Sequence, residues 1–186
     1  SIHNGDLDMI TTGNRIDLDT DNDTSIRARI DDVITFEAGT TDTMEIHNGK
    51  VFINETVNGN MTIGLTINHA ANVDEVIALK GSNVGHVMTD LAEADTYATL
   101  GITGDGSNGG LTVRSYSEGN KSFDIVSRQN TGGHVTSDTT SSKAGVTVIA
   151  QISDGANDVT VMPATGNVFA VTDGTNTRLI VKGNGT

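Results

Sequence analysis

The chain has 186 residues, a formal net charge of −13 at pH 7, no cysteine and no tryptophan. The acidic balance argues against nucleic acid and anionic membrane surfaces as partners, because both attract clustered Lys and Arg. The absence of cysteine excludes disulfides and thiol chemistry, and no apolar run approaches the roughly 18 residues of a membrane span.

The composition is typical of an all-β protein with many tight turns. The chain contains 16 isoleucines and 17 valines against 8 leucines, and 27 threonines add to the β-branched total. Branching at Cβ restricts the side chain and suits a pleated strand better than a helix. Aspartate outnumbers glutamate by 18 to 6, and its short side chain favours turns. Aromatic residues make up only 3%, so we expect a thin, regular structure or a core that is shared between chains.

Short strands are expected at regular intervals between residues 15 and 67, because apolar and polar residues alternate there. Asn48-Gly49 and Asn58-Gly59 predict tight turns between these strands. Arg27 and Arg29 are expected on the face opposite the core. The apolar positions expected on the buried face are Ile16, Leu18, Ile26, Ala28, Ile30, Ile34, Phe36, Met44, Ile46, Val51, Ile53, Met61, Ile63, Leu65 and Ile67.

The segment from Asn68 to Tyr97 is richer in alanine and glutamate, and we place a domain boundary near Asn68. Asp90 and Glu93 resemble a helix-capping pair, which predicts a short helical turn near residues 90–95, or a loop with one helical turn. Strands return in "TYATLGIT", "GLTVRSYS", "SFDIVSR", "GVTVIAQI", "DVTVMPAT", "NVFAVTDG" and "TRLIVKG". The polar stretch Thr131 to Gly145 is expected to be an exposed loop.

These patterns predict two regions. Residues 1–67 are expected to form a repetitive, fibre-like β structure, either a β-solenoid or an intertwined trimeric β shaft. Residues 68–186 are expected to form a β-sandwich or a further β-repeat region. Strands with narrow apolar faces cannot each bury enough surface alone, so stacking of repeats or winding of three chains would supply the core.

The candidate metal ligands are Asp17, Asp19, Asp21 and Asp23, which alternate within "NRIDLDTDNDTSIRARI". A calcium loop of the EF-hand type needs a glycine at its sixth position and a glutamate at its twelfth. Counting from Asp17 places Asn22 and Ala28 there, and counting from Asp19 places Thr24 and Ile30 there. We therefore favour a strand that ends in an aspartate-rich turn, with a calcium site as the alternative.

Catalytic and cofactor motifs are absent from the sequence. There is no nucleophile elbow, zinc-protease motif or phosphate-binding loop, and "GDGSNGG" lacks the Lys-Ser/Thr ending that phosphate binding requires. The five histidines share no metal-ligand spacing. Sugar binding would need exposed rings, and Tyr97 and Tyr116 are the candidates, with packing at strand or subunit contacts as the simpler interpretation. We expect no enzyme activity and no cofactor.

Two long segments resemble parts of bacteriophage tail-fibre and virion structural proteins of the marine and environmental type. They are "RIDLDTDNDTSIRARIDDVITFEAGTTDTMEIHNGKVFI" and "GLTINHAANVDEVIALKGSNVGHVMTDLAEADTYATL", and together they cover roughly residues 14–100. "VFINETVNGN" departs from the ending that such repeats usually have. The resemblance implies an elongated, β-rich, homotrimeric fibre or spike that in some relatives ends in a receptor-binding tip.

The leading hypothesis is a structural, adhesive protein of a virion or extracellular fibre or spike that associates with itself and contacts a surface receptor or glycan. One alternative is a non-viral extracellular filament built by strand donation, with Ser1 to Thr12 as the donated strand. Another is a tail spike that binds or degrades polysaccharide. The chain begins at Ser1 without a signal-peptide pattern, as expected of a processed form or a fragment of a longer protein.

Overall fold

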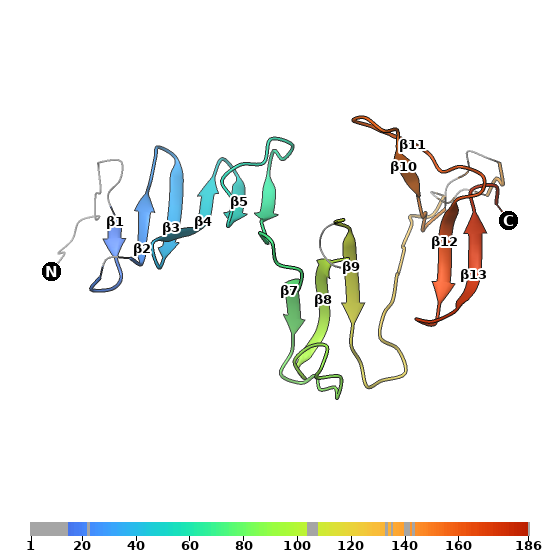
Figure 1. Cartoon of the computed structure of the whole chain (residues 1–186), viewed down its shortest axis with the longest axis horizontal. Helices are drawn as coiled ribbons and strands as arrows, with labels where there is room; N and C mark the ends of the chain where they lie inside the picture. The colour runs from blue at the N-terminus through green and yellow to red at the C-terminus, as the bar shows by residue number, and fades with distance from the viewer. Residues whose placement is uncertain are drawn as a thin grey trace. The chain divides into compact units, whose positions relative to one another are not determined.

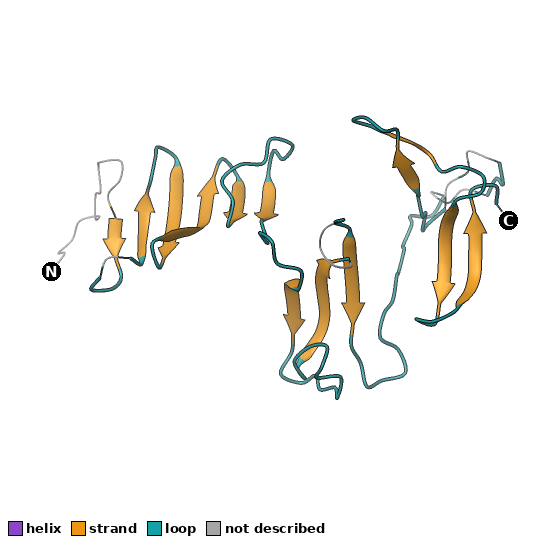
Figure 2. Ribbon diagram, in the orientation of Figure 1, coloured by secondary structure: helices purple, strands orange, loops and turns teal. Residues whose placement is uncertain are grey.

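The computed structural model describes residues 15–21, 23–103, 108–132, 134, 136–139, 142 and 144–185. The described residues form thirteen strands in four small sheets and contain no helix, which confirms the all-β prediction (Figure 2). The chain divides into two compact units, Ser1–Phe123 and Asp124–Thr186. The proposed donated strand, Ser1 to Thr12, lies outside the described residues.

The first unit begins with a six-stranded sheet in which neighbours in sequence are neighbours in space (Figure 1). Five strands form an antiparallel meander, and the sixth runs parallel to the fifth. Asn48 and Gly49, both with positive φ, turn the fourth strand into the fifth, as the sequence predicted. The strands are β1 (Arg15–Asp17), β2 (Ser25–Ala28), β3 (Val33–Ala38), β4 (Thr41–His47), β5 (Lys50–Ile53) and β6 (Gly64–Ile67).

A three-stranded antiparallel sheet follows, formed by β7 (Glu75–Lys80), β8 (Thr96–Ile102) and β9 (Leu111–Ser115). The connection between β7 and β8 returns to the sheet, where the ring of His86 bonds the Thr96 carbonyl oxygen at 2.9 Å. The buried residues of this part are His86, Ala92, Thr96, Thr99, Gly101 and Tyr116.

The second unit contains two antiparallel hairpins. They consist of β10 (Gln151–Ser153) with β11 (Val159–Val161), and of β12 (Asn167–Thr172) with β13 (Thr177–Lys182). Asp173-Gly174 lies at the turn of the second hairpin, as predicted, and Gly174 has a φ of 91°. None of the described residues in this unit is buried.

Several finer predictions differ from the structure. Strand β7 was not predicted from the sequence, because its apolar alternation is short and the strand depends on pairing with β8. "SFDIVSR" forms no strand, and only the end of "GVTVIAQI" does. Where a short helical turn or a loop with one helical turn was expected near 90–95, residues 88–92 form a hydrogen-bonded turn in a loop. The Leu91 and Ala92 amides lie 3.0 and 3.4 Å from the Met88 oxygen.

No solenoid and no closed barrel occurs among the described residues, so the repetitive, fibre-like architecture stays a prediction. The expected boundary near Asn68 falls in the connection between β6 and β7, while the division into compact units falls after Phe123. The two hairpins of the second unit share no hydrogen-bonded sheet, and a sandwich there likewise stays a prediction.

The turn between β12 and β13 generates a prediction. One carboxylate oxygen of Asp173 accepts hydrogen bonds from the amides of Thr175 and Asn176 at 3.0 and 2.7 Å, and the other accepts hydrogen bonds from Nε and Nη2 of Arg178. These bonds, with that from Asn176 the largest contribution, hold the pKa of Asp173 below its usual range. A depressed pKa stabilises the hairpin above the ordinary aspartate pKa, and this stabilisation is lost as pH falls through the lowered value.

We therefore expect Asp173→Ala to accelerate amide hydrogen exchange at Val171 and Leu179, which pair across the hairpin. Asp173→Asn keeps an oxygen for the two amides but loses the charge facing Arg178. Its amide exchange rates should therefore fall between those of Asp173→Ala and those of the parent. Equal exchange rates in all three proteins at neutral pH would contradict this role of Asp173.

Candidate functional site

The two faces of the β1–β6 sheet differ sharply in chemistry. The cross-strand register aligns Ile16, Ile26, Phe36, Met44, Ile53 and Ile67 in one row, and Ala28, Ile34, Ile46, Val51 and Leu65 in a second. We call the face formed by these eleven residues the apolar face. The opposite, polar face carries Arg15, Asp17, Ser25, Arg27, Thr35, Glu37, Glu45 and Phe52.

Burial on this sheet is the reverse of what the sequence predicted. Glu45 is 2% exposed and Thr35 is fully buried on the polar face, whereas Ile34 and Leu65 on the apolar face are 50% and 54% exposed. The alternation predicted the faces correctly, but the side chains expected in a core are uncovered in the single chain. Phe52, which the alternation placed opposite the core, is fully buried and stacks on His47 with ring centroids 4.8 Å apart.

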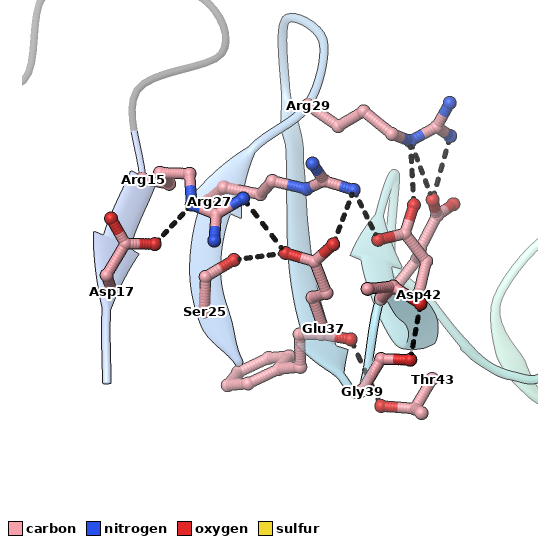
Figure 3. Close-up of polar contacts among 12 residues, drawn as sticks. Arg15, Asp17, Ser25, Arg27, Arg29, Glu37, Gly39, Asp42 and Thr43 are labelled. Atoms are coloured by element: carbon pink, nitrogen blue, oxygen red, sulfur yellow. Dashed lines mark hydrogen bonds and ion pairs between the residues drawn. The ribbon is translucent and has the colours of Figure 1, made fainter. Parts of the chain in front are cut away.

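The polar face is covered by its own side chains. Three arginines and four acids alternate across β1 to β4, and Figure 3 shows most of them reaching across neighbouring strands. We call this arrangement the ion-pair row; in order, it consists of Asp17, Arg15, Glu37, Arg27, Asp42, Arg29 and Glu45.

The closest contacts in the ion-pair row involve Arg27 and Arg29. Arg27 Nη2 lies 2.6 Å from Asp42 Oδ1, and this hydrogen bond is the largest cause of the raised pKa of Arg27. Arg29 Nε donates to Glu45 Oε1 at 2.9 Å, and Nη2 forms an ion pair with the same oxygen at 2.7 Å. Ser25 Oγ donates to Glu37 Oε2 at 2.7 Å. The charged groups of this face thus pair with one another, although Arg27 Nε and Glu45 Oε2 are buried without a hydrogen-bond partner.

The aspartates predicted as metal ligands occupy the connection between β1 and β2. Asp19, Asp21 and Asp23 bring carboxylate oxygens within 4.8 Å of one another, and they are the one such group among the described residues. Asp17 belongs to the ion-pair row instead, through Arg15. Hydrogen bonding from the Thr24 side chain lowers the pKa of Asp19, while desolvation and the charge of Asp21 raise the pKa of Asp23.

An open hollow of about 710 Å³ lies against the second sheet. Its lining carries four carboxylates, those of Asp74, Glu75, Asp90 and Glu93, and one arginine, Arg114. Tyr116 also lines it but is only 6% exposed and stacks on His86, with ring centroids 5.1 Å apart. Packing thus accounts for Tyr116, whereas Tyr97 is 43% exposed.

The histidines in the described part of the chain do not form a cluster. His69 pairs with Asp74 at 2.8 Å, His47 and His86 stack on aromatic rings, and His134 is exposed. His3 and most of "GDGSNGG" lie outside the described residues. No helix in the described ranges is long and apolar enough to cross a membrane.

Comparisons with known proteins give no family assignment. No family model, no curated protein and no solved structure matches the chain. The resemblance to tail-fibre proteins therefore stays an expectation from sequence.

The ion-pair row generates a prediction about stability. Arg29→Met removes the donor from a carboxylate that is almost fully buried, and an unsatisfied buried acceptor costs about 1–3 kcal/mol. We expect a lower urea midpoint for this variant and a recovery of most of the loss in Arg29→Met with Glu45→Leu. Lys80→Met, which removes exposed ion pairs with Glu93 and Asp95, is the control and should have a smaller effect. A double variant less stable than Arg29→Met would contradict the assignment.

A second prediction concerns calcium. Three carboxylates offer fewer than the six to eight oxygens that calcium takes, which favours the turn interpretation of the aspartates. We expect the melting temperature to stay constant in a titration up to millimolar calcium. A rise that disappears in Asp21→Asn, and persists in the control Asp158→Asn, would show instead that calcium binds here.

Proposed function

We propose that this chain is a structural subunit of a virion or extracellular fibre or spike, in which three copies associate and the role is mechanical and adhesive rather than catalytic. The number of copies rests on the resemblance to tail-fibre proteins. The need for association rests on the small number of buried residues in the single chain.

The second unit carries the proposal, because none of its described residues is buried. Its two hairpins expose apolar side chains on their strands, among them Val161, Phe169, Val171 and Leu179. An isolated two-stranded hairpin is only marginally stable in water and needs further strands or a packing partner. Other copies of the chain would supply that partner.

The first unit supports the same conclusion with a very small interior. Val33, Phe52, Ala92 and Tyr116 are its buried hydrophobic residues, whereas 16 large hydrophobic side chains among its described residues are exposed. Exposed apolar surface beyond a few hundred Å² usually marks an interaction site. The net charge of −13 would keep the resulting assembly soluble.

The chemistry of the described groups favours a structural role over catalysis. The charges of the ion-pair row are engaged with one another, and the buried His86 holds backbone atoms of its own connection. A filament built by strand donation and a polysaccharide-acting spike remain the competing hypotheses from sequence, and no observation on the described residues favours either one.

Native mass tests the proposal. The chain has a mass of 19.3 kDa, and sedimentation equilibrium of the intact protein should give three times that value. Because the hairpins of the second unit would fold only with their partners, thermal unfolding should depend on protein concentration. A monomer with a concentration-independent transition would contradict the proposal, and an open series of larger species would favour the filament.

A further inference from the structure

We infer that copies of this chain meet through the apolar face of the β1–β6 sheet, and that the polar face with its ion-pair row points to solvent. This inference rests on the proposed self-association and adds which surface carries it.

The described strands of the first unit form no second layer over the apolar face. All substantial contacts between described strands join hydrogen-bonded neighbours, so the β1–β6 sheet is a single layer. Ile16, Ile34, Ile53 and Leu65 are between 38% and 54% exposed, and the other large side chains of the face are half-buried. An antiparallel sheet of this kind normally buries one face against a second layer.

The distribution of charged side chains also favours the apolar face as the surface where copies meet. The chain carries a net charge of −13, so two copies repel one another over most approaches. None of the eleven residues of the apolar face is charged, whereas every charged side chain on strands β1 to β4 that enters the ion-pair row lies on the opposite face. The apolar face is thus a surface on which two copies can meet without bringing like charges together.

The large exposed area of the chain favours another copy as the partner that covers the apolar face. The whole chain exposes 14107 Å². Two compact domains with the lengths of the two units would together expose roughly 10000 Å². The difference is on the order of 4000 Å² per chain and comes from both units. Shared between the two interfaces that each copy makes in a closed trimer, it is within the range that permanent complexes bury. In a closed ring of three copies, each chain can turn the same uncharged face towards the common axis, where it meets the faces of the other two copies.

The polar face needs no such partner. Glu45 and Thr35 are already shielded by the side chains of the ion-pair row, and the arginines that cover them are 24–38% exposed. Such a face suits the water-exposed surface of an assembly.

The test compares two apolar-to-acid changes in the intact chain. Ile34→Asp places a charge at the centre of the apolar face, opposite Ile46. Val57→Asp is the matched control, since Val57 is 69% exposed in the connection between β5 and β6 and lies off the face. In sedimentation we expect Ile34→Asp to shift the mass towards the single chain and Val57→Asp to keep the parent mass. Parent-like association of Ile34→Asp would overturn the inference.

A second variant keeps the test decisive where Ile34→Asp fails to fold. The chain has no cysteine, so Ile34→Cys and Val57→Cys each introduce one thiol. A water-soluble maleimide should label Cys at position 57 rapidly in the native assembly and label Cys at position 34 only after dissociation. Equal labelling rates in a protein that still associates would overturn this inference alone. A parent protein that is monomeric would overturn the proposed function with it.

Discussion

The structure depends on one constraint: the first unit concentrates eleven apolar side chains on one face of a single-layer sheet, and no other described strand of that unit packs on this face. Cross-strand pairing fixes this arrangement, because a shift of one residue in any strand of β1–β6 would move its isoleucines to the charged face. The sheet is therefore well specified in register while its apolar face is left for a partner. The second unit leaves its apolar side chains uncovered as well, since none of the described residues of its hairpins is buried.

The polar face shows how the chain keeps such a sheet ordered as a single layer. Arg15 on β1 reaches Glu37 on β3, and Arg27 on β2 reaches Glu37 on β3 and Asp42 on β4. Arg29, which follows β2, pairs with Asp42 and Glu45 on β4, so the row links β1 to β4 (Figure 3). The aliphatic stems of these arginines can also shield what lies beneath them, in agreement with the full burial of Thr35. Exposed ion pairs contribute little individually, but a connected row that includes the buried Glu45 contributes more and enforces register.

Much of the first sheet could be predicted from sequence, because alternation identifies which residues share a face. Ile26, Phe36 and Met44 do form one row, and Asn48-Gly49 does turn the chain. Alternation does not tell what covers a face, so the burial of Glu45 and Thr35 within the single chain was not predicted. Phe52 was missed for the same reason. Strand β7 was missed because its pairing with β8 is non-local, and "SFDIVSR" alternates well but finds no partner strand among the described residues. The proximity of Asp19, Asp21 and Asp23 was suggested by their spacing, whereas the engagement of Asp17 with Arg15 depended on the register of β1.

The central claim is that the apolar face is covered in the native protein. Hydroxyl-radical footprinting of the unmodified chain tests it most directly, because it reports the solvent contact of each side chain without any substitution. The account predicts that Ile34 and Leu65, half exposed in the single chain, are labelled far more slowly in the native protein than in the urea-unfolded chain, while Val57 is labelled at similar rates in both. Labelling of Ile34 and Leu65 at the native rate of Val57 would contradict it.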